Sequence, residues 1–210
     1  EDVPGPPRES DGSALLEVRD LAVSYGGALS ALQGVSMTVP KGAIVAVLGA
    51  NGAGKSTLLR AISGTLGLQG GSADSGVIRF EGKDVRDVGP AEAVRAGIML
   101  LPGDRKREAL ATVLGVRANS TIQSLRRFSL FGFLRRRAER KAVRDLVSRL
   151  EIRTPSLEQP VEFLSGGNQQ KVSVSRTFLR EPSVILAYEP TQGVDVGSRF
   201  DIYRALRART

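Results

Sequence analysis

An eight-residue glycine-rich segment constrains the fold of this chain more than any other feature. Residues Gly49–Ser56 read GANGAGKS and match the pattern G-x-x-x-x-G-K-[ST]. They follow the apolar, β-branched run Ile44–Leu48, which predicts a buried strand, and they precede Thr57–Ile62, which predicts a helix. Glycine lets the backbone curl until several N–H groups point at one anion, and the start of a helix adds further attraction. The segment therefore predicts a phosphate-binding loop for a nucleoside triphosphate.

Two later segments indicate which kind of nucleotide-binding protein this is. Leu164–Gln170 reads LSGGNQQ, and Ser165 is a good N-cap for a helix from Gly166 to about residue 179. The apolar run Val184–Ala187 predicts a strand that leads into an acidic end at Glu189. Taken alone, Ser-Gly-Gly is usually a capped helix after a turn. Its position between a phosphate-binding loop and a strand ending in Glu-Pro favours a second helix start that binds phosphate.

In this order the motifs resemble the ATP-binding domain of ABC transporters, and the resemblance runs from about residue 15 to the last residue. Gly49–Ser56 resembles the Walker A loop, and Leu164–Gln170 resembles the signature loop. Val184–Glu189 is similar to Walker B with its catalytic glutamate, and Gly193–Asp195 is similar to the D-loop. The resemblance therefore implies an ATPase.

Three segments indicate a particular subgroup of this family. Pro102–Glu108, Leu164–Val172 and Glu189–Gly197 resemble the sugar-import ATPases for ribose, xylose and galactosides, and most closely the second of the two ATPase halves in those proteins. The stretch before Asp84 is more similar to the amino-acid importers. The resemblance thus indicates the family more firmly than the class of solute.

The resemblance implies a role for each matching residue. Tyr25 would stack on adenine, Glu189 would orient and polarise the attacking water, and Asp195 would belong to the D-loop. The phosphates and Mg²⁺ would be held by Gly49, Asn51, Gly52, Ala53, Gly54, Lys55, Ser56 and Thr57. Within that set, Lys55 would reach the terminal phosphates and Ser56 would ligate Mg²⁺. Two such domains would pair head to tail, so that the signature loop closes over the ATP of the opposite subunit. The residues of this loop would be Ser165, Gly166, Gly167 and Gln169.

Plainer interpretations of the same residues stay open. Tyr25 fits a half-buried strand aromatic, and Gln169 fits an amide on a helix surface. Asp195 fits a turn acid before a helix, and Glu189 fits an exposed acid at a strand end.

Two positions depart from the family pattern. Tyr188 stands where the family has an aspartate that holds the Mg²⁺ shell, and Gly103 stands where the family has glutamine or glutamate after a proline. The chain also contains no histidine, whereas the family has a switch histidine on a strand beyond the D-loop helix. We therefore expect a piece of a longer protein whose ATP hydrolysis is impaired by Tyr188 and Gly103.

The pattern of elements predicts the fold class and its domains. Alternating strands and helices predict an α/β domain, a P-loop NTPase with a mixed or parallel sheet core. A mostly helical stretch, about residues 103–179, predicts a helical subdomain that carries the signature loop. Residues 1–13 are rich in Pro, Gly and acidic residues and predict a disordered leader or linker. Residues 14–210 would form one ATP-binding domain, truncated at its C-terminal end.

Three shorter stretches also carry local signals. Residues 67–76 are rich in Gly and Ser and predict a loop. Pro90–Ala96 predicts a short helix with proline at its start, and Val116–Leu125 predicts another helix.

The amino-acid composition excludes several classes of protein and of site. The absence of cysteine excludes a disulfide framework and a Cys-ligated zinc site. No apolar run approaches the length of a membrane-spanning helix, and the N-terminus has no hydrophobic signal core. The net charge of +8 is concentrated in residues 126–149. This region could be a patch for nucleic acid or anionic lipid, or simply a solvated helical face. Its few aromatics do not indicate a stacking platform for bases, so we expect no nucleic acid partner.

We therefore expect an ATP-binding and hydrolysing subunit that powers a membrane importer for sugars or related small polar solutes. Its partners would be a transmembrane permease, a second ATP-binding domain and a solute-binding protein, and its location the cytoplasmic face of the membrane. One alternative is a degenerate ATP-binding half with a structural or regulatory role and little hydrolysis. Another is a soluble ABC ATPase that is not linked to transport.

Overall fold

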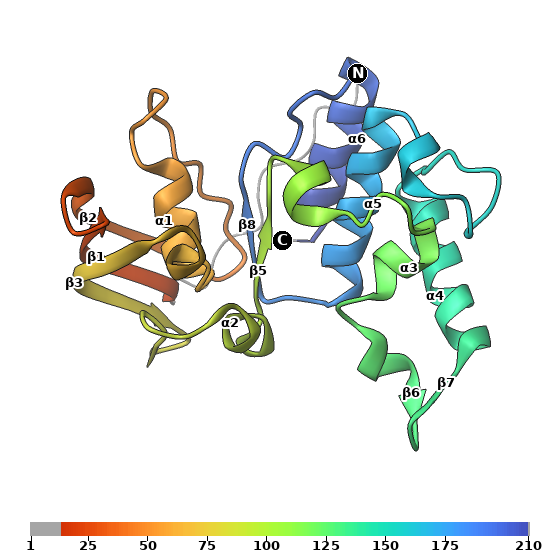
Figure 1. Ribbon diagram of the computed structural model, residues 1–210, viewed down its shortest axis with the longest axis horizontal. Helices are drawn as coiled ribbons and strands as arrows, with labels where there is room; N and C mark the ends of the chain where they lie inside the picture. Colours follow the sequence, from red (N-terminus) through yellow and green to blue (C-terminus); the bar gives the residue numbers. More distant parts are fainter. Residues whose placement is uncertain (1–13, 210) are drawn as a thin grey trace. The chain divides into compact units, whose positions relative to one another are not determined.

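The computed structural model describes residues 14–209 (Figure 1), and the predicted leader, residues 1–13, lies outside the described residues. The chain divides into two compact units. The first ends at Ile98, and the second comprises Met99–Arg209.

The first unit is built on an antiparallel four-stranded sheet with the order β2-β1-β3-β4. The strands are β1 (Ala14–Tyr25), β2 (Leu29–Pro40), β3 (Gly71–Phe80) and β4 (Lys83–Asp84). Leu16, Val18, Leu21 and Val23 of β1 are buried and contribute to the core of this unit, and β1 is hydrogen-bonded on both sides, to β2 and β3. The helical elements of this unit are α1 (Lys55–Ile62), η1 (Leu66–Gln69) and α2 (Pro90–Ala96). Pro90 starts α2 and the left-handed Gly97 ends it, as is usual at helix termini.

Two expectations for the first unit are wrong. Ile44–Leu48 forms no strand, and its side chains are largely exposed, with Leu48 at 90%. A buried parallel strand needs a hydrogen-bonded neighbour, and no segment within residues 14–209 pairs with this run. The predicted Gly/Ser loop, residues 67–76, is instead η1 followed by most of β3. The C-terminal part of β1 pairs with this stretch, from Tyr25 opposite Gly71 to Ala22 opposite Ser75.

The second unit contains most of the helices. Its strands β5 (Ile98–Leu101) and β8 (Val184–Ala187) pair with each other, and β6 (Ser129–Leu130) and β7 (Phe133–Leu134) form a hairpin. The short helical elements are η2 (Arg105–Ala109), α3 (Val116–Thr121), η3 (Leu125–Phe128) and η4 (Val161–Phe163). The longer helices are α4 (Arg136–Arg149), α5 (Gly166–Leu179) and α6 (Val196–Arg207). The predicted helix at residues 116–125 is shorter than expected, because the chain turns after Thr121, where the Ser124 N–H donates to the Thr121 carbonyl.

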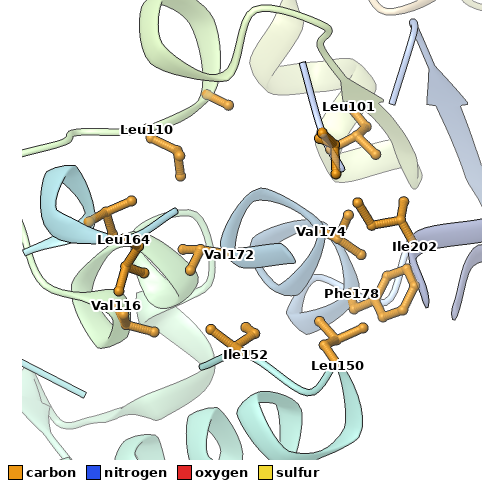
Figure 2. Packing of buried hydrophobic residues seen from close by; sticks show 13 residues of the cluster. Leu101, Leu110, Val116, Leu150, Ile152, Leu164, Val172, Val174, Phe178 and Ile202 are labelled. Carbon is orange, nitrogen blue, oxygen red and sulfur yellow. The ribbon is translucent and has the colours of Figure 1, made fainter. Parts of the chain in front are cut away.

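The core of the second unit lies around α5. Figure 2 shows Val174 and Phe178 of this helix close to Ile202 of α6, and Val172 turned toward Val116 of α3. Nearly every residue of α5 is buried, including polar ones. Ser175 satisfies its buried hydroxyl by a 2.7 Å hydrogen bond with Ser120 of α3. The central position of α5 therefore fixes both of its ends, including the predicted signature loop.

None of the helices within residues 14–209 is long and apolar enough to cross a membrane.

Candidate functional site

The glycine-rich loop of the first unit owes its shape to backbone conformations that favour glycine. Gly52 and Gly54 have φ values of 84° and 82°. A Cβ atom at Gly54 would lie 2.5 Å from Leu32 Cδ2 and 2.8 Å from the carbonyl oxygen of Ala31, both on β2. Gly54 is therefore required by sterics as well as by its φ angle, and it forms the N-cap of α1.

The electrostatics of this loop suit an anion. The Lys55 ammonium donates to the carbonyl oxygens of Gly49 at 2.7 Å and Ala50 at 2.8 Å, which holds it across the loop. The first turn of α1 contains no acidic residue. Its leading N–H groups have no partner within the helix, and the helix dipole makes this end positive. Ser56 and Thr57 lie in that turn, so the residues present fit the phosphates of a nucleotide.

Tyr25, the predicted adenine-stacking residue, is joined to the same helix. Its hydroxyl lies 3.3 Å from the hydroxyl of Thr57. A Cβ atom at Gly71 would lie 2.9 Å from Tyr25 Cε1, so the ring covers this glycine. The structure thus brings Tyr25 to the start of α1 together with Thr57.

In the second unit, the two departures from the family pattern are neighbours. The chain leaves β5 at Gly103 and leaves β8 at Tyr188, and the Tyr188 N–H donates to the Leu101 carbonyl at 3.0 Å. Gly103 is buried, and a Cβ atom there would lie 3.1 Å from Tyr188 O and 3.3 Å from Tyr188 Cδ1. The tyrosine ring therefore packs against the glycine, and a side chain at position 103 would have to displace it.

Glu189, the predicted catalytic residue, has an unusual backbone. It is exposed and has a φ of 43°, in the left-handed region that non-glycine residues rarely adopt. The turn that follows is closed by a 3.0 Å hydrogen bond from the Gln192 N–H to the Glu189 carbonyl. Residues held in such conformations cluster at functional sites.

The predicted signature loop is a capped helix start. The Ser165 hydroxyl accepts hydrogen bonds from the backbone N–H of Asn168 at 3.4 Å and from its side-chain amide at 2.9 Å. Gln169 is buried, and its amide nitrogen donates to the carbonyls of Val161 and Leu164 at 3.1 Å each. The Gln169 side chain therefore points into the protein, whereas Ser165 is exposed.

Sequence reasoning assigned no role to Arg105, which connects three segments of the second unit. Its guanidinium donates to Gln169 Oε1 at 3.4 Å and to the carbonyl oxygens of Gln192 at 2.8 Å and Gly193 at 3.4 Å. A Cβ atom at Gly166 would lie only 2.7 Å from its Nη2. Arg105 thus joins the start of α5 to the turn that precedes α6. The sequence signals for it were the cluster of basic residues after Pro102 and the resemblance of Pro102–Glu108 to the sugar-import ATPases.

Asp195 forms the N-cap of α6. Its carboxylate accepts a 2.9 Å hydrogen bond from the Ser198 N–H, and this bond holds the pKa of Asp195 below its ordinary value. A Cβ atom at Gly167 would lie 2.8 Å from Asp195 Oδ2 and 2.3 Å from Ser198 Oγ. The predicted D-loop and the predicted signature loop are therefore in direct contact, and glycine at 167 makes this contact possible.

The fold and these loops define an ATP-binding cassette. The chain matches the solved structure of a nucleotide-free ATP-binding cassette from an ABC transporter with a TM-score of 0.77 and 27% identity, over 94% of this chain and 78% of that one. It matches cbiO1 from Clostridium perfringens with a TM-score of 0.74 and 26% identity, over 95% and 74% of the two chains. The predicted α/β P-loop NTPase class is thereby confirmed.

A family model described as ABC transporter matches residues 32–192, which is most of the chain. The protein therefore belongs to the ABC transporter family, as the motifs predicted.

Similar proteins carry the names of sugar importers. The chain is 40% identical over 204 residues to a putative ribose/galactose/methyl galactoside import ATP-binding protein of Burkholderia lata, covering 97% of this chain and 38% of that protein. It is 38% identical over 195 residues to the ribose import ATP-binding protein RbsA of Pseudomonas putida, covering 93% and 36%. It is 41% identical over 174 residues to the xylose import ATP-binding protein XylG of Burkholderia ambifaria, covering 83% and 33%. The chain thus spans less than two fifths of the length of these relatives.

Proposed function

We propose that this chain is an ATP-binding and hydrolysing cassette that powers a membrane importer for sugars or related small polar solutes. The observation that carries the proposal is the loop around Lys55, where positive-φ glycines, a lysine ammonium and an acid-free helix start form a site for phosphates. The names of the relatives support the choice of solute.

In this proposal the first unit binds the nucleotide. Tyr25 stacks on adenine, and Gly49, Asn51, Gly52, Ala53, Gly54, Lys55, Ser56 and Thr57 hold the phosphates. Mg²⁺, when bound with ATP, supplies charge neutralisation at the phosphate oxygens, and Ser56 is the residue that would hold it. No group of three or more His, Cys, Asp and Glu residues in the described part of the chain could hold a metal ion. This fits an ion that takes many of its ligands from phosphates and water.

The second unit supplies the hydrolytic group. Glu189 orients and polarises the attacking water, a general-base role that typically contributes about 10²–10⁴-fold to the rate. Its position just beyond the end of β8 and its exposed carboxylate support this assignment. The remainder of catalysis is positioning and electrostatic stabilisation of a loose phosphoryl transition state.

The same unit acts on a second ATP. We infer that Ser165, Gly166, Gly167 and Gln169 close over the nucleotide of an opposite cassette, with Asp195 of the D-loop beside them. The inward hydrogen bonds of Gln169 assign it a supporting role, whereas Ser165 caps α5 at an exposed position where a partner can reach it. The partners are a second ATP-binding domain, a transmembrane permease and a solute-binding protein, and the assembly sits at the cytoplasmic face of the membrane.

Replacing Lys55 tests the nucleotide site. Lys55→Ala should weaken ATP binding at least about tenfold, because a charge-assisted hydrogen bond to phosphate is lost. Titration calorimetry of the purified chain measures this effect. Lys41→Ala, which changes an exposed lysine outside the loop, is the matched control and should bind like the wild type. Equal affinities for the two variants would refute the proposed site.

Replacing Ser165 tests the pairing. Ser165→Arg should leave ATP binding by the single chain intact and abolish ATP-dependent dimerisation, which size-exclusion chromatography with light scattering measures. Parallel loss of both properties would contradict the assignment of the signature loop to the opposite subunit.

A specific observation favours a second candidate, a cassette that binds ATP and hydrolyses it slowly. Tyr188 carries a phenol where the family has a carboxylate, and Mg²⁺ favours carboxylate and phosphate oxygens as ligands. Its ring covers Gly103, which has no side chain to reach the attacking water. We infer that these two positions together weaken both the dependence on Mg²⁺ and the turnover.

Restoring the carboxylate separates the two candidates. Tyr188→Asp should raise ATP hydrolysis and its dependence on Mg²⁺, and Glu189→Gln in the same background should remove the gain. Phosphate release under single-turnover conditions measures both. Wild-type turnover of about 1 s⁻¹ or more, a rate typical of enzymes, would rule out the slow cassette.

A further inference from the structure

The hairpin formed by β6 and β7 has an unusual turn. Ser129 pairs with Leu134 and Leu130 pairs with Phe133, which leaves Phe131 and Gly132 as a two-residue loop. Their φ values of 50° and 84° are both positive, as in a type I′ turn. Such turns strongly prefer Asn-Gly, and a bulky aromatic residue at positive φ is an outlier that costs conformational energy. The folded hairpin alone therefore gives no reason for phenylalanine at position 131.

The apolar side chains of this hairpin face solvent. Phe131 is 93% exposed, Phe133 is 80% exposed and Leu130 is 53% exposed. The base of the hairpin, in contrast, is well anchored: Phe128 is buried, and its carbonyl accepts a 2.8 Å hydrogen bond from the Arg135 N–H. Figure 1 shows the hairpin projecting from the second unit beyond the start of α4. The result is a fixed, convex tip that carries two aromatic rings.

The chain around this tip is strongly basic. Residues 124–138 contain Arg126, Arg127, Arg135, Arg136 and Arg137 and no acidic residue. Arg127 pairs with Glu181. None of the other four forms a salt bridge with a carboxylate inside residues 14–209, and all four are exposed. The tip thus combines apolar rings with four exposed arginines that form no salt bridge within the described residues, although Arg117 and, more weakly, Arg136 lower the pKa of the Glu158 carboxyl.

We propose that this hairpin contacts an anionic phospholipid bilayer directly, with Leu130, Phe131 and Phe133 in the headgroup region and the flanking arginines at the lipid phosphates. Aromatic side chains beside basic residues are the combination by which peripheral segments bind anionic membranes. A projecting tip offers no groove in which a peptide could bind. The headgroup region of a bilayer is fluid and can accommodate such a tip. The contact requires neither ATP binding nor hydrolysis, so its failure would leave the proposed function untouched.

Vesicle flotation of the purified chain tests the proposal. The wild type should bind vesicles of phosphatidylcholine and phosphatidylglycerol, bind pure phosphatidylcholine at least about tenfold more weakly, and lose binding as salt is raised. The double variant Phe131→Asn with Phe133→Thr should reduce partitioning into the anionic vesicles by about tenfold or more, since two rings no longer enter the interface. Both replacements suit a hairpin, so the variant should keep or raise the melting temperature.

Two matched controls complete the experiment. Phe163→Ser removes an exposed ring elsewhere in the second unit and should bind vesicles like the wild type. Arg126→Gln with Arg135→Gln keeps the rings and should weaken binding to anionic vesicles only. Equal binding of the wild type to anionic and neutral vesicles, or undiminished binding of the Phe131→Asn, Phe133→Thr variant, would overturn the proposal. So would binding that appears only when vesicles contain a permease, because the hairpin would then contact protein.

Discussion

The loop around Lys55 and the loops around the start of α5 are both rich in glycine, but they are held in different ways. The first is fixed by its backbone, with left-handed glycines and a steric limit at Gly54. The second is fixed by side chains: Ser165 and Asp195 cap two helices, and Arg105 joins the segments between them. In the second region glycine serves to make room, since Gly167 admits the Asp195 cap and Gly166 admits the Arg105 guanidinium.

This difference predicts which changes each region tolerates. An added methyl group is damaging in either region, because a Cβ atom would lie 2.5 Å from Leu32 Cδ2 at Gly54 and 2.3 Å from Ser198 Oγ at Gly167. In the region held by side chains, deletion of one hydrogen-bonding group is enough to release several segments.

The largest expected effect is on the backbone-held loop. Gly54→Ala should destabilise the protein by about 3 kcal/mol, because the new methyl group combines strain at positive φ with overlap against β2. Gly52→Ala is the matched control: its φ is also positive, but a Cβ atom there meets nothing within 4 Å, so only about 1 kcal/mol is expected. Urea denaturation measures both values. Equal losses would show that sterics at Leu32 are irrelevant.

The next effect concerns Arg105. Arg105→Ala should lower the free energy of unfolding by about 2 kcal/mol, because the carbonyls of Gln192 and Gly193 lose their donor. Arg105→Lys should recover little of this loss, since an ammonium lacks the planar fork that reaches several acceptors at once. Arg107→Ala, at an exposed arginine of the same helical element, provides the reference. If Arg105→Lys restored the full free energy of unfolding, the positive charge alone would account for the role of Arg105.

The smallest effect concerns a side-chain pair that holds α5 against α6. The Lys171 ammonium donates to Asp201 at 2.7 Å, which holds the pKa of Asp201 below its ordinary value. A lowered folded-state pKa contributes stability above the unfolded pKa of about 3.9 and loses it as the pH falls through the folded value. Lys171→Met should therefore cost about 1–2 kcal/mol near neutral pH. The difference from the wild type should shrink at about pH 3, because the unfolded carboxylate already binds a proton below its pKa of about 3.9. Denaturation curves at both pH values measure this, and a pH-independent difference would exclude the pair as its cause.

Local signals account for what the sequence predicted well. Ser165 before two glycines marks the start of α5, and Pro90 and Gly97 bracket α2, because caps are encoded within a few residues. The predictions failed for segments whose structure depends on pairing with residues distant in the sequence. The Gly/Ser stretch joined β3 because β1 paired with it, and Ile44–Leu48 formed no strand despite its composition.

The candidate site shows the same contrast between local signals, which the sequence reveals, and long-range contacts, which it does not. The motif residues of the phosphate loop were found from spacing alone, because eight consecutive positions carry the pattern. Arg105 was missed because its partners lie 64 to 88 residues away in the chain, and no periodicity relates them. The contact between Gly103 and Tyr188 was missed for the same reason, although each residue was singled out separately.

That contact also couples a change at either position to the residue at the other. A Cβ atom at position 103 would lie 3.3 Å from Cδ1 of Tyr188, so an added side chain requires the ring to shift by a few tenths of an ångström. We therefore expect Gly103→Ala and Tyr188→Asp to be non-additive, with the alanine costing less stability beside the aspartate than beside the tyrosine. Restoring the two family positions one at a time would then underestimate the effect of restoring both.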